Sequence, residues 1–269
     1  KAHNLLYAVG LTLMMPVSAQ ATGIPVPDVP DTPPPAALQD LTINGQPVTT
    51  DSIRRVELEG PIYEVRLRNG DTFYSDAQGR HMVVGSLYDN GPDGLINVTE
   101  QHDRQDRLDQ LSAIPEGDTV DYPAQGEEIG RITVFTDTTC PYCQKLHQEI
   151  DQLTQAGVTV RYVPFPRAGA HSQAGNQLAQ VLCSQFSTDA MTHAFHGEAL
   201  TSRASKSCRS AVEDGFTLGQ QFGVQGTPTI VLPNGEMGEG YAPSDDDSDE
   251  ESDESGSSSS NDDEDGDNT

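Results

Sequence analysis

The sequence predicts an α/β (α+β) protein in which a small antiparallel β domain is joined by a helical linker to a larger domain with a mixed sheet. Short β-type runs separated by turn signals occupy residues 38–98. A strongly polar helical stretch follows, and residues 125–243 then read as strand, helix, strand, helices and a final hairpin. That order is typical of a domain in which helices cover a mixed sheet.

The composition limits the partners of the chain. Its 269 residues include 42 Asp and Glu against 15 Lys and Arg, which gives a formal net charge of −27. Such a charge repels phosphate backbones, so we expect no nucleic acid as a partner. Residues 244–269 contain 13 of the acidic residues among Ser, Gly, Asn and Thr. This segment is predicted to be a disordered, solvated tail without a role in catalysis.

The first 21 residues have the layout of a signal peptide. Lys1 precedes the mostly apolar stretch Leu5–Val17, and small residues follow up to Ala19 and Ala21. A membrane anchor is the alternative, but roughly 12 apolar residues are too few where about 20 are needed to span a bilayer. We therefore expect export, with cleavage after Ala19 or Ala21, into an oxidising compartment in which disulfides persist.

The segments that follow build the small domain. Residues 22–37 are rich in proline and are predicted to form an extended leader. Residues 38–98 form the predicted antiparallel domain, with Asn69-Gly70 as a hairpin turn. A domain of this size buries its core only marginally, and oligomerisation often compensates. Its strands are expected at Ile53–Leu58, Ile62–Leu67, Thr72–Tyr74 and His81–Val84.

Residues 99–124 are predicted to contain the linker helix. Leu108, Leu111 and Ile114 recur at helical spacing, and Pro115 ends the helix. Because most other side chains in this stretch are polar, we expect the helix to lie mainly in water. The elements of the larger domain follow: strands at Arg131–Thr136 and Val158–Phe165, helices from Cys140 to about Ala156, from Ser172 to about Gln185 and from Val212 to Phe222, and a hairpin of Thr229–Leu232 and Glu236–Tyr241.

A Cys-x-x-Cys motif, Cys140-Pro141-Tyr142-Cys143, lies between the first strand and the first helix of the larger domain. Unpaired N–H groups and the partial positive charge of a helix N-terminus stabilise a thiolate, which makes Cys140 the candidate nucleophile. Cys143 lies one turn later and can close a disulfide with it. Pro141 is tolerated in the first turn. The two cysteines can therefore cycle between dithiol and disulfide.

Two other interpretations of these cysteines are weaker. A structural disulfide across so short a loop at a helix start would be strained. A structural zinc site would need Cys183 and Cys208 as well, which lack the second Cys-x-x-Cys typical of such sites. We therefore expect a redox-active pair and no metal.

The second motif is Gly226-Thr227-Pro228-Thr229, at the start of the predicted final hairpin. A proline that enters a strand cannot donate to the ladder, and a cis peptide before it would turn the chain sharply. The backbone of Thr227 would then remain free to pair with a substrate strand. An ordinary trans proline is the alternative, but the Cys-Pro-Tyr-Cys motif in the same domain favours the cis form.

These stretches resemble the periplasmic disulfide isomerases DsbC and DsbG, which have a thioredoxin-like catalytic domain. The similarity is strongest in Arg131–His147, Gly157–Arg167, Gly223–Leu232 and His81–Asp89. The resemblance implies a V-shaped homodimer joined through the small N-terminal dimerisation domains. The match of His81-Met82-Val83-Val84-Gly85 to the dimerising strand of the family puts the interface there.

The resemblance also implies roles for single residues. Cys140 matches the attacking thiol and Cys143 the resolving thiol, while Tyr142, Thr227 and Pro228 match substrate-binding positions, with Pro228 as the cis-proline. Cys183 and Cys208 match an additional structural disulfide that is present in DsbC and absent from DsbG-type proteins. A regulatory redox pair is the alternative interpretation of these two cysteines.

Three features depart from the family pattern. The dipeptide between the active-site cysteines, Pro141-Tyr142, is that of DsbG-like proteins, whereas the similarity elsewhere is closer to DsbC. The proline-rich leader replaces the amphipathic N-terminal helix of the family. After Pro243 the acidic tail replaces a last helix, so either that helix is absent or another segment covers the sheet.

The expected activity is thiol–disulfide exchange in the periplasm on misfolded, disulfide-containing exported proteins. Cys140 would form a mixed disulfide, and incorrect disulfides would be isomerised or reduced. The resemblance implies a membrane electron donor of the DsbD type, and no cofactor is expected. The alternatives are a reductant of oxidised single cysteines, as in DsbG, a dithiol oxidase, and a holdase chaperone whose thiols are incidental.

Overall fold

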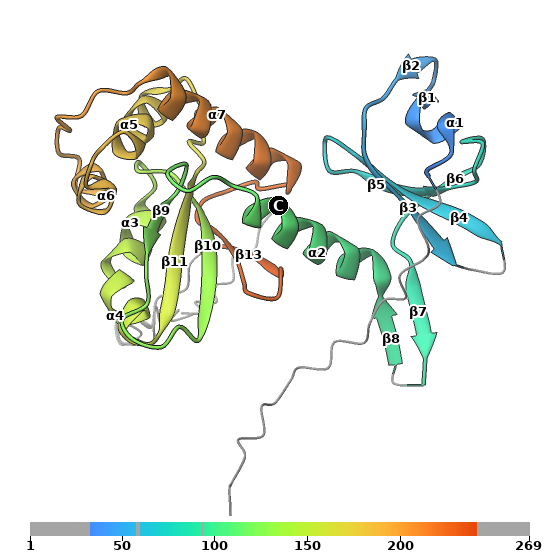
Figure 1. Cartoon of the computed structure of the whole chain (residues 1–269), viewed down its shortest axis with the longest axis horizontal. Helices are drawn as coiled ribbons and strands as arrows, with labels where there is room; N and C mark the ends of the chain where they lie inside the picture. Colours follow the sequence, from blue (N-terminus) through green and yellow to red (C-terminus); the bar gives the residue numbers. More distant parts are fainter. Residues whose placement is uncertain (1–32, 58–59, 93, 241–269) are drawn as a thin grey trace, which may run out of the picture.

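The computed structural model describes residues 33–57, 60–92 and 94–240. The predicted signal peptide, the proline-rich leader up to residue 32 and the acidic tail therefore lie outside the described residues. Figure 1 shows two bodies, each built around its own sheet, with the helix α2 (Val98–Ser112) between them.

The N-terminal body is built on a four-stranded antiparallel sheet in the order β3-β4-β5-β6. The chain turns at Asn69-Gly70, where Gly70 has a φ of 90°, a conformation that favours glycine. Two short hairpins accompany the sheet. The strands are β1 (Thr42–Ile43), β2 (Gln46–Pro47), β3 (Thr50–Glu57), β4 (Pro61–Leu67), β5 (Thr72–Ser75), β6 (Met82–Val84), β7 (Tyr88–Gly91) and β8 (Gly94–Asn97).

A short helix that the sequence does not predict, α1 (Ala36–Gln39), precedes these strands. Its Leu38 and the following Leu41 are buried against Val65 and Phe73 of the sheet. Four residues are too few to produce a helical hydrophobic period, so only the packing of the leucines on the sheet reveals the helix. The helix thus begins in the last two residues of the predicted leader and contributes Leu38 to the core of the small domain.

The expectation that the linker helix α2 lies mainly in water is wrong. Asn97 caps the helix by accepting from the backbone N–H of Glu100, at 3.0 Å. Along the helix Thr99, His102, Arg107 and Leu111 are buried. Three of these four are polar, and a polar side chain in the sequence gives no sign that it will be buried with a partner.

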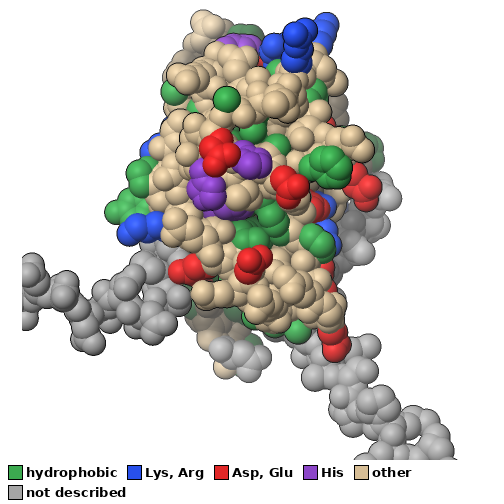
Figure 2. Space-filling model, turned by 90° about the vertical axis from the view of Figure 1, so that its left-hand side faces the viewer, with side chains coloured by type: hydrophobic (Ala, Val, Ile, Leu, Met, Phe, Trp, Pro, Cys, Tyr) green, Lys and Arg blue, Asp and Glu red, His purple; other side chains and the backbone are tan. Residues whose placement is uncertain are grey.

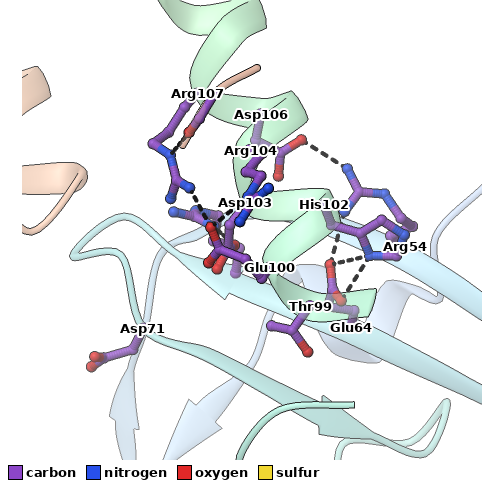
Figure 3. Close-up of polar contacts among 12 residues, drawn as sticks. Arg54, Glu64, Asp71, Thr99, Glu100, His102, Asp103, Arg104, Asp106 and Arg107 are labelled. Carbon is purple, nitrogen blue, oxygen red and sulfur yellow. Dashed lines mark hydrogen bonds and ion pairs between the residues drawn. The ribbon is translucent and has the colours of Figure 1, made fainter. Parts of the chain in front are cut away.

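The partners come mainly from the sheet of the N-terminal body, as Figure 3 shows. Glu64 of β4 is only 4% exposed and lies 2.9 Å from Nδ1 of His102 and 2.8 Å from Nη1 of Arg54. The hydroxyl of Tyr74 donates to the same carboxylate at 2.8 Å. Arg54 also reaches Asp106 of α2 at 2.8 Å. Glu64 thus binds the first half of α2 to the sheet.

The second half of α2 contacts the C-terminal body. Arg107 donates through Nε to the carbonyl of Gly235 at 2.9 Å. Leu111 packs in a core cluster together with Phe135 and Val231 of the C-terminal sheet. The linker helix is therefore attached at both of its ends by buried contacts.

Replacing Glu64 with glutamine is expected to destabilise the protein by about 2 kcal/mol at pH 7. Burial raises the pKa of Glu64, but hydrogen bonds with His102 and Tyr74 and the positive charge of Arg54 outweigh it, so the net pKa is lowered. A carboxylate with a lowered folded-state pKa stabilises the fold above its unfolded pKa, and this stabilisation is lost as the pH falls through the folded pKa.

Urea unfolding of wild type and Glu64→Gln from pH 3 to pH 7 measures this effect. The difference between the two proteins should be largest at neutral pH and should shrink below about pH 4. A difference that stays constant over the whole range would contradict the assignment of a stabilising charge to Glu64.

The C-terminal body contains a five-stranded mixed sheet in the order β13-β12-β10-β11-β9. Its strands are β9 (Val120–Tyr122), β10 (Gly130–Thr136), β11 (Val158–Pro164), β12 (Thr229–Val231) and β13 (Met237–Glu239). β10 and β11 are parallel, and the other pairs are antiparallel. β9 lies in the segment predicted as linker, because three residues give too little pattern to indicate a strand.

Helices cover both faces of this sheet, and strand residues alternate between the two faces. Val134 and Tyr162 contribute to one core cluster, and their neighbours Phe135 and Val163 to the other. The helices are α3 (Pro141–Gln148), α4 (Ile150–Gln155), α5 (Gln173–Leu182), α6 (Ser187–Phe195) and α7 (Lys206–Gln221). The sequence does not predict α6, and α7 begins six residues before the predicted start. The strand–helix junction after β10 carries the Cys-x-x-Cys motif.

Candidate active site

Cys140 is the N-cap residue of α3, and Pro141 occupies the first turn of that helix. The carbonyl of Cys140 accepts from the backbone N–H of Gln144 at 3.1 Å, which begins the helical ladder. Cys143 lies within the first turn, and both cysteines are buried free thiols. The local sequence folds in this way because proline has no N–H to lose at a helix start and its φ already suits a helix.

The environment lowers the pKa of the Cys140 thiol. Burial acts in the opposite direction, but hydrogen bonds with the Thr227 side chain, with Cys143 and with the backbone amide of Tyr142 outweigh it. Backbone N–H groups at a helix N-terminus are donors that favour a thiolate. Cys140 therefore has the more acidic thiol of the pair.

Cys143 has the opposite character. Burial raises the pKa of its thiol to about 11, although hydrogen bonds with the side chain of Thr136 and the backbone of Asp137 oppose the rise. A negative charge on Cys140 raises this pKa further. The pair thus combines a thiol that ionises readily with one that stays protonated at neutral pH.

The loop before β12 faces the cysteines. The peptide bond between Thr227 and Pro228 is cis. The Cys140 sulfur donates to the Thr227 carbonyl at 3.1 Å, although 87 residues separate the two in sequence. Cys140, Cys143, Thr227 and Pro228, which sequence reasoning singled out in two distant motifs, therefore lie at one place.

The two residues between the cysteines differ in environment from their neighbours. Tyr142 is 56% exposed, whereas Cys140 is only 1% exposed. Nζ of Lys145 lies 5.9 Å from the centroid of the Tyr142 ring. Tyr142 is therefore an aromatic side chain available to a bound molecule beside the thiols.

Asp137 is part of the site, although sequence reasoning did not select it. It is 1% exposed, its Oδ1 accepts from the backbone N–H of Thr139 at 2.8 Å, and its carbonyl accepts from the N–H of Cys140 at 3.0 Å. An Asp side chain often accepts a hydrogen bond from the backbone N–H two residues later, which forms a turn. An Asp three residues before Cys140 could therefore have been recognised in the sequence as part of the loop. Its partner Arg167 lies 30 residues away and carries no such signal.

The other two cysteines form a disulfide with each other. Cys183 is the C-cap residue of α5, and Cys208 lies in the first turn of α7. Their Cα atoms are 5.9 Å apart. The bridge joins these two helices, and Cys208 packs against the core cluster that contains Cys140 and Cys143.

Histidine and acidic side chains gather on the face of the C-terminal body that Figure 2 shows. In the C-terminal body, His193 and Glu198 form an ion pair. Within the described ranges, however, no group of three or more His, Cys, Asp or Glu side chains is arranged to hold a metal ion.

Two family models match the chain. One, described as a thioredoxin-like domain, covers residues 116–249, and the other, described as the N-terminal domain of the disulfide bond isomerase protein, covers residues 29–100. The thiol:disulfide interchange protein DsbC of Escherichia coli K12 is 37% identical over 177 residues, which are 66% of this chain and 71% of that protein. The chain belongs to the DsbC family. The DsbC of Pasteurella multocida is 32% identical over 76% of this chain and 83% of its own length.

A disulfide interchange protein from Neisseria gonorrhoeae, known from its crystal structure, is 30% identical in sequence. The match covers 47% of this chain and 87% of that chain, with a TM-score of 0.38.

Membership of the DsbC family confirms the predicted α+β fold, with a thioredoxin-like domain and a DsbC-type N-terminal domain. It also confirms the predicted enzyme class, since proteins of this family are thiol:disulfide interchange oxidoreductases. None of the helices in the described part of the chain is long and apolar enough to cross a membrane.

Proposed function

We propose that the protein isomerises and reduces incorrect disulfides in misfolded exported proteins, with Cys140 as the attacking thiol and Cys143 as the resolving thiol. The observation that carries the proposal is the contrast between the two buried thiols. The environment lowers the pKa of Cys140 and raises that of Cys143 to about 11. Only the first is suited to attack at neutral pH.

Each step of the exchange breaks one disulfide bond and forms another. The Cys140 thiolate attacks a substrate disulfide, forms a mixed disulfide and releases one substrate thiolate. If another substrate thiol displaces Cys140, the disulfide is isomerised and no net electrons are transferred. If Cys143 displaces the substrate instead, the substrate gains two electrons and a Cys140–Cys143 disulfide forms. A dithiol donor of the DsbD type must then reduce that disulfide.

The loop at Thr227-Pro228 supports a place for the substrate chain. Because the peptide is cis and the Thr227 carbonyl faces the Cys140 sulfur, a substrate strand bound along this loop would bring its own disulfide to Cys140. Such a strand would take over the hydrogen bond that the Thr227 carbonyl now receives from the thiol. The exposed ring of Tyr142 supplies an apolar contact beside it.

Refolding of a scrambled multi-disulfide protein tests the proposal. Wild type should restore the native pairing of the substrate in the presence of a trace of reductant, and Cys140→Ala should show only the uncatalysed rate. Full activity of Cys140→Ala would overturn the enzymatic proposal in favour of a holdase. Serine is avoided as a replacement because its hydroxyl could still bond to Thr227.

A reductant of oxidised single cysteines is the second candidate, and the Pro141-Tyr142 dipeptide between the cysteines favours it. Cys143→Ala should trap mixed disulfides, because the resolving thiol is missing. Trapped partners with several disulfides would support isomerisation, whereas partners with a single cysteine would support the second candidate.

The edge strand β6 supports assembly into a homodimer. β6 is the last strand of its sheet, and its Val83 and Val84 are 67% and 82% exposed. An exposed apolar edge strand offers unpaired backbone groups and apolar side chains to a second copy.

We expect Val84→Asp to shift the protein from dimer to monomer in analytical ultracentrifugation. Ile129→Asp, at an equally exposed apolar position of the C-terminal body, is the matched control and should remain a dimer.

The proposed organisation of the chain follows from this function. Residues 1–21 would direct export to the periplasm, and residues 22–37 would form the leader to the dimerisation domain at 38–98. The linker predicted at 99–124 would connect this domain to the catalytic domain predicted at 125–243, whose sheet also includes β9 from the linker segment. The acidic tail at 244–269 follows. The compartment would supply the exported substrates and would allow the Cys183–Cys208 disulfide to persist.

A further inference from the structure

The buried carboxylate of Asp137 lies between β10 and α3, in the loop that leads into the active-site cysteines. Its Oδ1 accepts from the backbone N–H and the hydroxyl of Thr139, at 2.8 and 2.7 Å. Its Oδ2 accepts from the backbone N–H of Arg167 at 2.9 Å and from the guanidinium Nε of Arg167 at 3.2 Å. The carboxylate therefore connects the active-site loop to the segment that follows β11.

The hydrogen bonds keep this carboxylate ionised. Burial raises the pKa of Asp137, but the bonds from Thr139 and Arg167 outweigh it, so the net pKa is lowered. Three of the four donors to Asp137 are neutral. The fourth, the guanidinium of Arg167, carries a positive charge that offsets the carboxylate. Removing that charge would leave Asp137 hydrogen-bonded but uncompensated.

Asp137 contacts both cysteines through its backbone. The Asp137 carbonyl accepts from the N–H of Cys140, and the Asp137 backbone also bonds to the Cys143 thiol. A negative charge near a sulfur disfavours its thiolate, and a positive charge favours it. In a dithiol–disulfide pair, a less stable thiolate makes the reduced form less stable. The balance between Asp137 and Arg167 should therefore act on the redox equilibrium.

We propose that Arg167 is a positioning residue that offsets the Asp137 carboxylate beside Cys140 and Cys143 and thereby sets how readily the pair is oxidised. The inference rests on the proposed function, because it deepens the role of the same two cysteines. Arg167 acts through Asp137, and no contact with substrate is required of it.

The proposal predicts that replacing Arg167 and replacing Asp137 shift the pKa of Cys140 in opposite directions. Arg167→Gln should raise the pKa of Cys140, read from thiolate absorbance at 240 nm, by about 0.5 to 1 unit. Its equilibrium constant for oxidation by glutathione should rise by about 3- to 10-fold. Asp137→Asn should shift both quantities in the other direction, and the double variant should return close to wild type.

Two controls separate charge from structure. Arg167→Lys keeps the positive charge and should remain within about 0.3 unit of the wild-type pKa. Arg161→Gln, on β11, breaks a comparable ion pair with Asp121 of the neighbouring strand β9 and should shift neither quantity. Circular dichroism of each variant reports whether it is folded.

The result that would overturn the inference is a shift in the same direction for Arg167→Gln and Asp137→Asn, or no shift in folded variants. A purely structural clamp predicts the former, since both changes would loosen the same loop. Failure of the proposed function looks different. In that case Cys140→Ala would keep full activity on the scrambled substrate, while the thiolate titration and the glutathione equilibrium would still compare the Arg167 and Asp137 variants.

Discussion

In the reduced protein, Cys140 is expected to react with iodoacetamide at pH 7 at least about tenfold faster than Cys143. The pKa of Cys143 is raised to about 11, so only about 1 in 10,000 of its thiols is ionised at this pH. The pKa of Cys140 lies below its usual value, which gives a thiolate fraction at least about 100 times larger. The lower intrinsic nucleophilicity of a more acidic thiol removes about tenfold of that advantage.

Peptide mapping by mass spectrometry after timed alkylation of wild type measures both rates in one sample. Wild type is preferable to single-cysteine variants, because the two thiols are hydrogen-bonded to each other and removing one would change the pKa of the other. Cys183 and Cys208 are in a disulfide and serve as an unreactive internal control. Both sulfurs are buried, so a difference in rate cannot be assigned to exposure alone.

The pH dependence gives a second, independent reading. The rate at Cys140 should rise about tenfold per pH unit and then level off at its lowered pKa, whereas the rate at Cys143 should still be rising at pH 10. Equal rates at the two cysteines, or a plateau that Cys143 reaches first, would contradict the division into attacking and resolving thiol.

The sequence was sufficient to predict elements with a strong local signal. The Cys-Pro-Tyr-Cys motif predicted a strand–helix junction, because proline and the helix N-terminus act within a few residues. The Asn69-Gly70 pair predicted a hairpin turn for a similarly local reason, since glycine at positive φ is required there. These features depend on neighbours in sequence, which a single chain displays directly.

The features that the sequence did not predict depend on partners far along the chain. Glu64 and His102 are 38 residues apart and are buried together, so each looks like a surface residue when taken alone. The same holds for Asp137 and Arg167, which differ by 30 positions. A charged side chain is buried only when its partner is present, and a single sequence does not reveal which charges meet. The elements α1 and β9 were missed because four and three residues do not repeat a hydrophobic pattern often enough to reveal it.

Removal of the Cys183–Cys208 disulfide is expected to destabilise the protein by about 3.5 kcal/mol and to lower its melting temperature by about 10 °C. The sequence separation of 25 means that the bridge closes a loop of moderate length in the unfolded chain. In the chain-entropy model, opening such a loop increases the conformational freedom of the unfolded state, which favours unfolding. Urea unfolding of oxidised wild type and of the double variant Cys183→Ala/Cys208→Ala measures the loss.

Reductant provides the matched comparison for this stability effect. Dithiothreitol should bring wild type close to the double variant, because both then lack the bridge. In the double variant, dithiothreitol can reduce only a Cys140–Cys143 disulfide. The difference in its stability with and without dithiothreitol therefore measures the contribution of the active-site pair. A double variant as stable as oxidised wild type would contradict a structural role for the bridge.

Activity distinguishes a structural bridge from a regulatory one. Cys183 and Cys208 join the end of α5 to the start of α7, whereas the thiols of the active site lie at the start of α3. At a temperature where the double variant is fully folded, its activity on the scrambled substrate should therefore stay within about twofold of wild type. A large change in activity without a loss of stability would instead indicate that this bridge regulates Cys140.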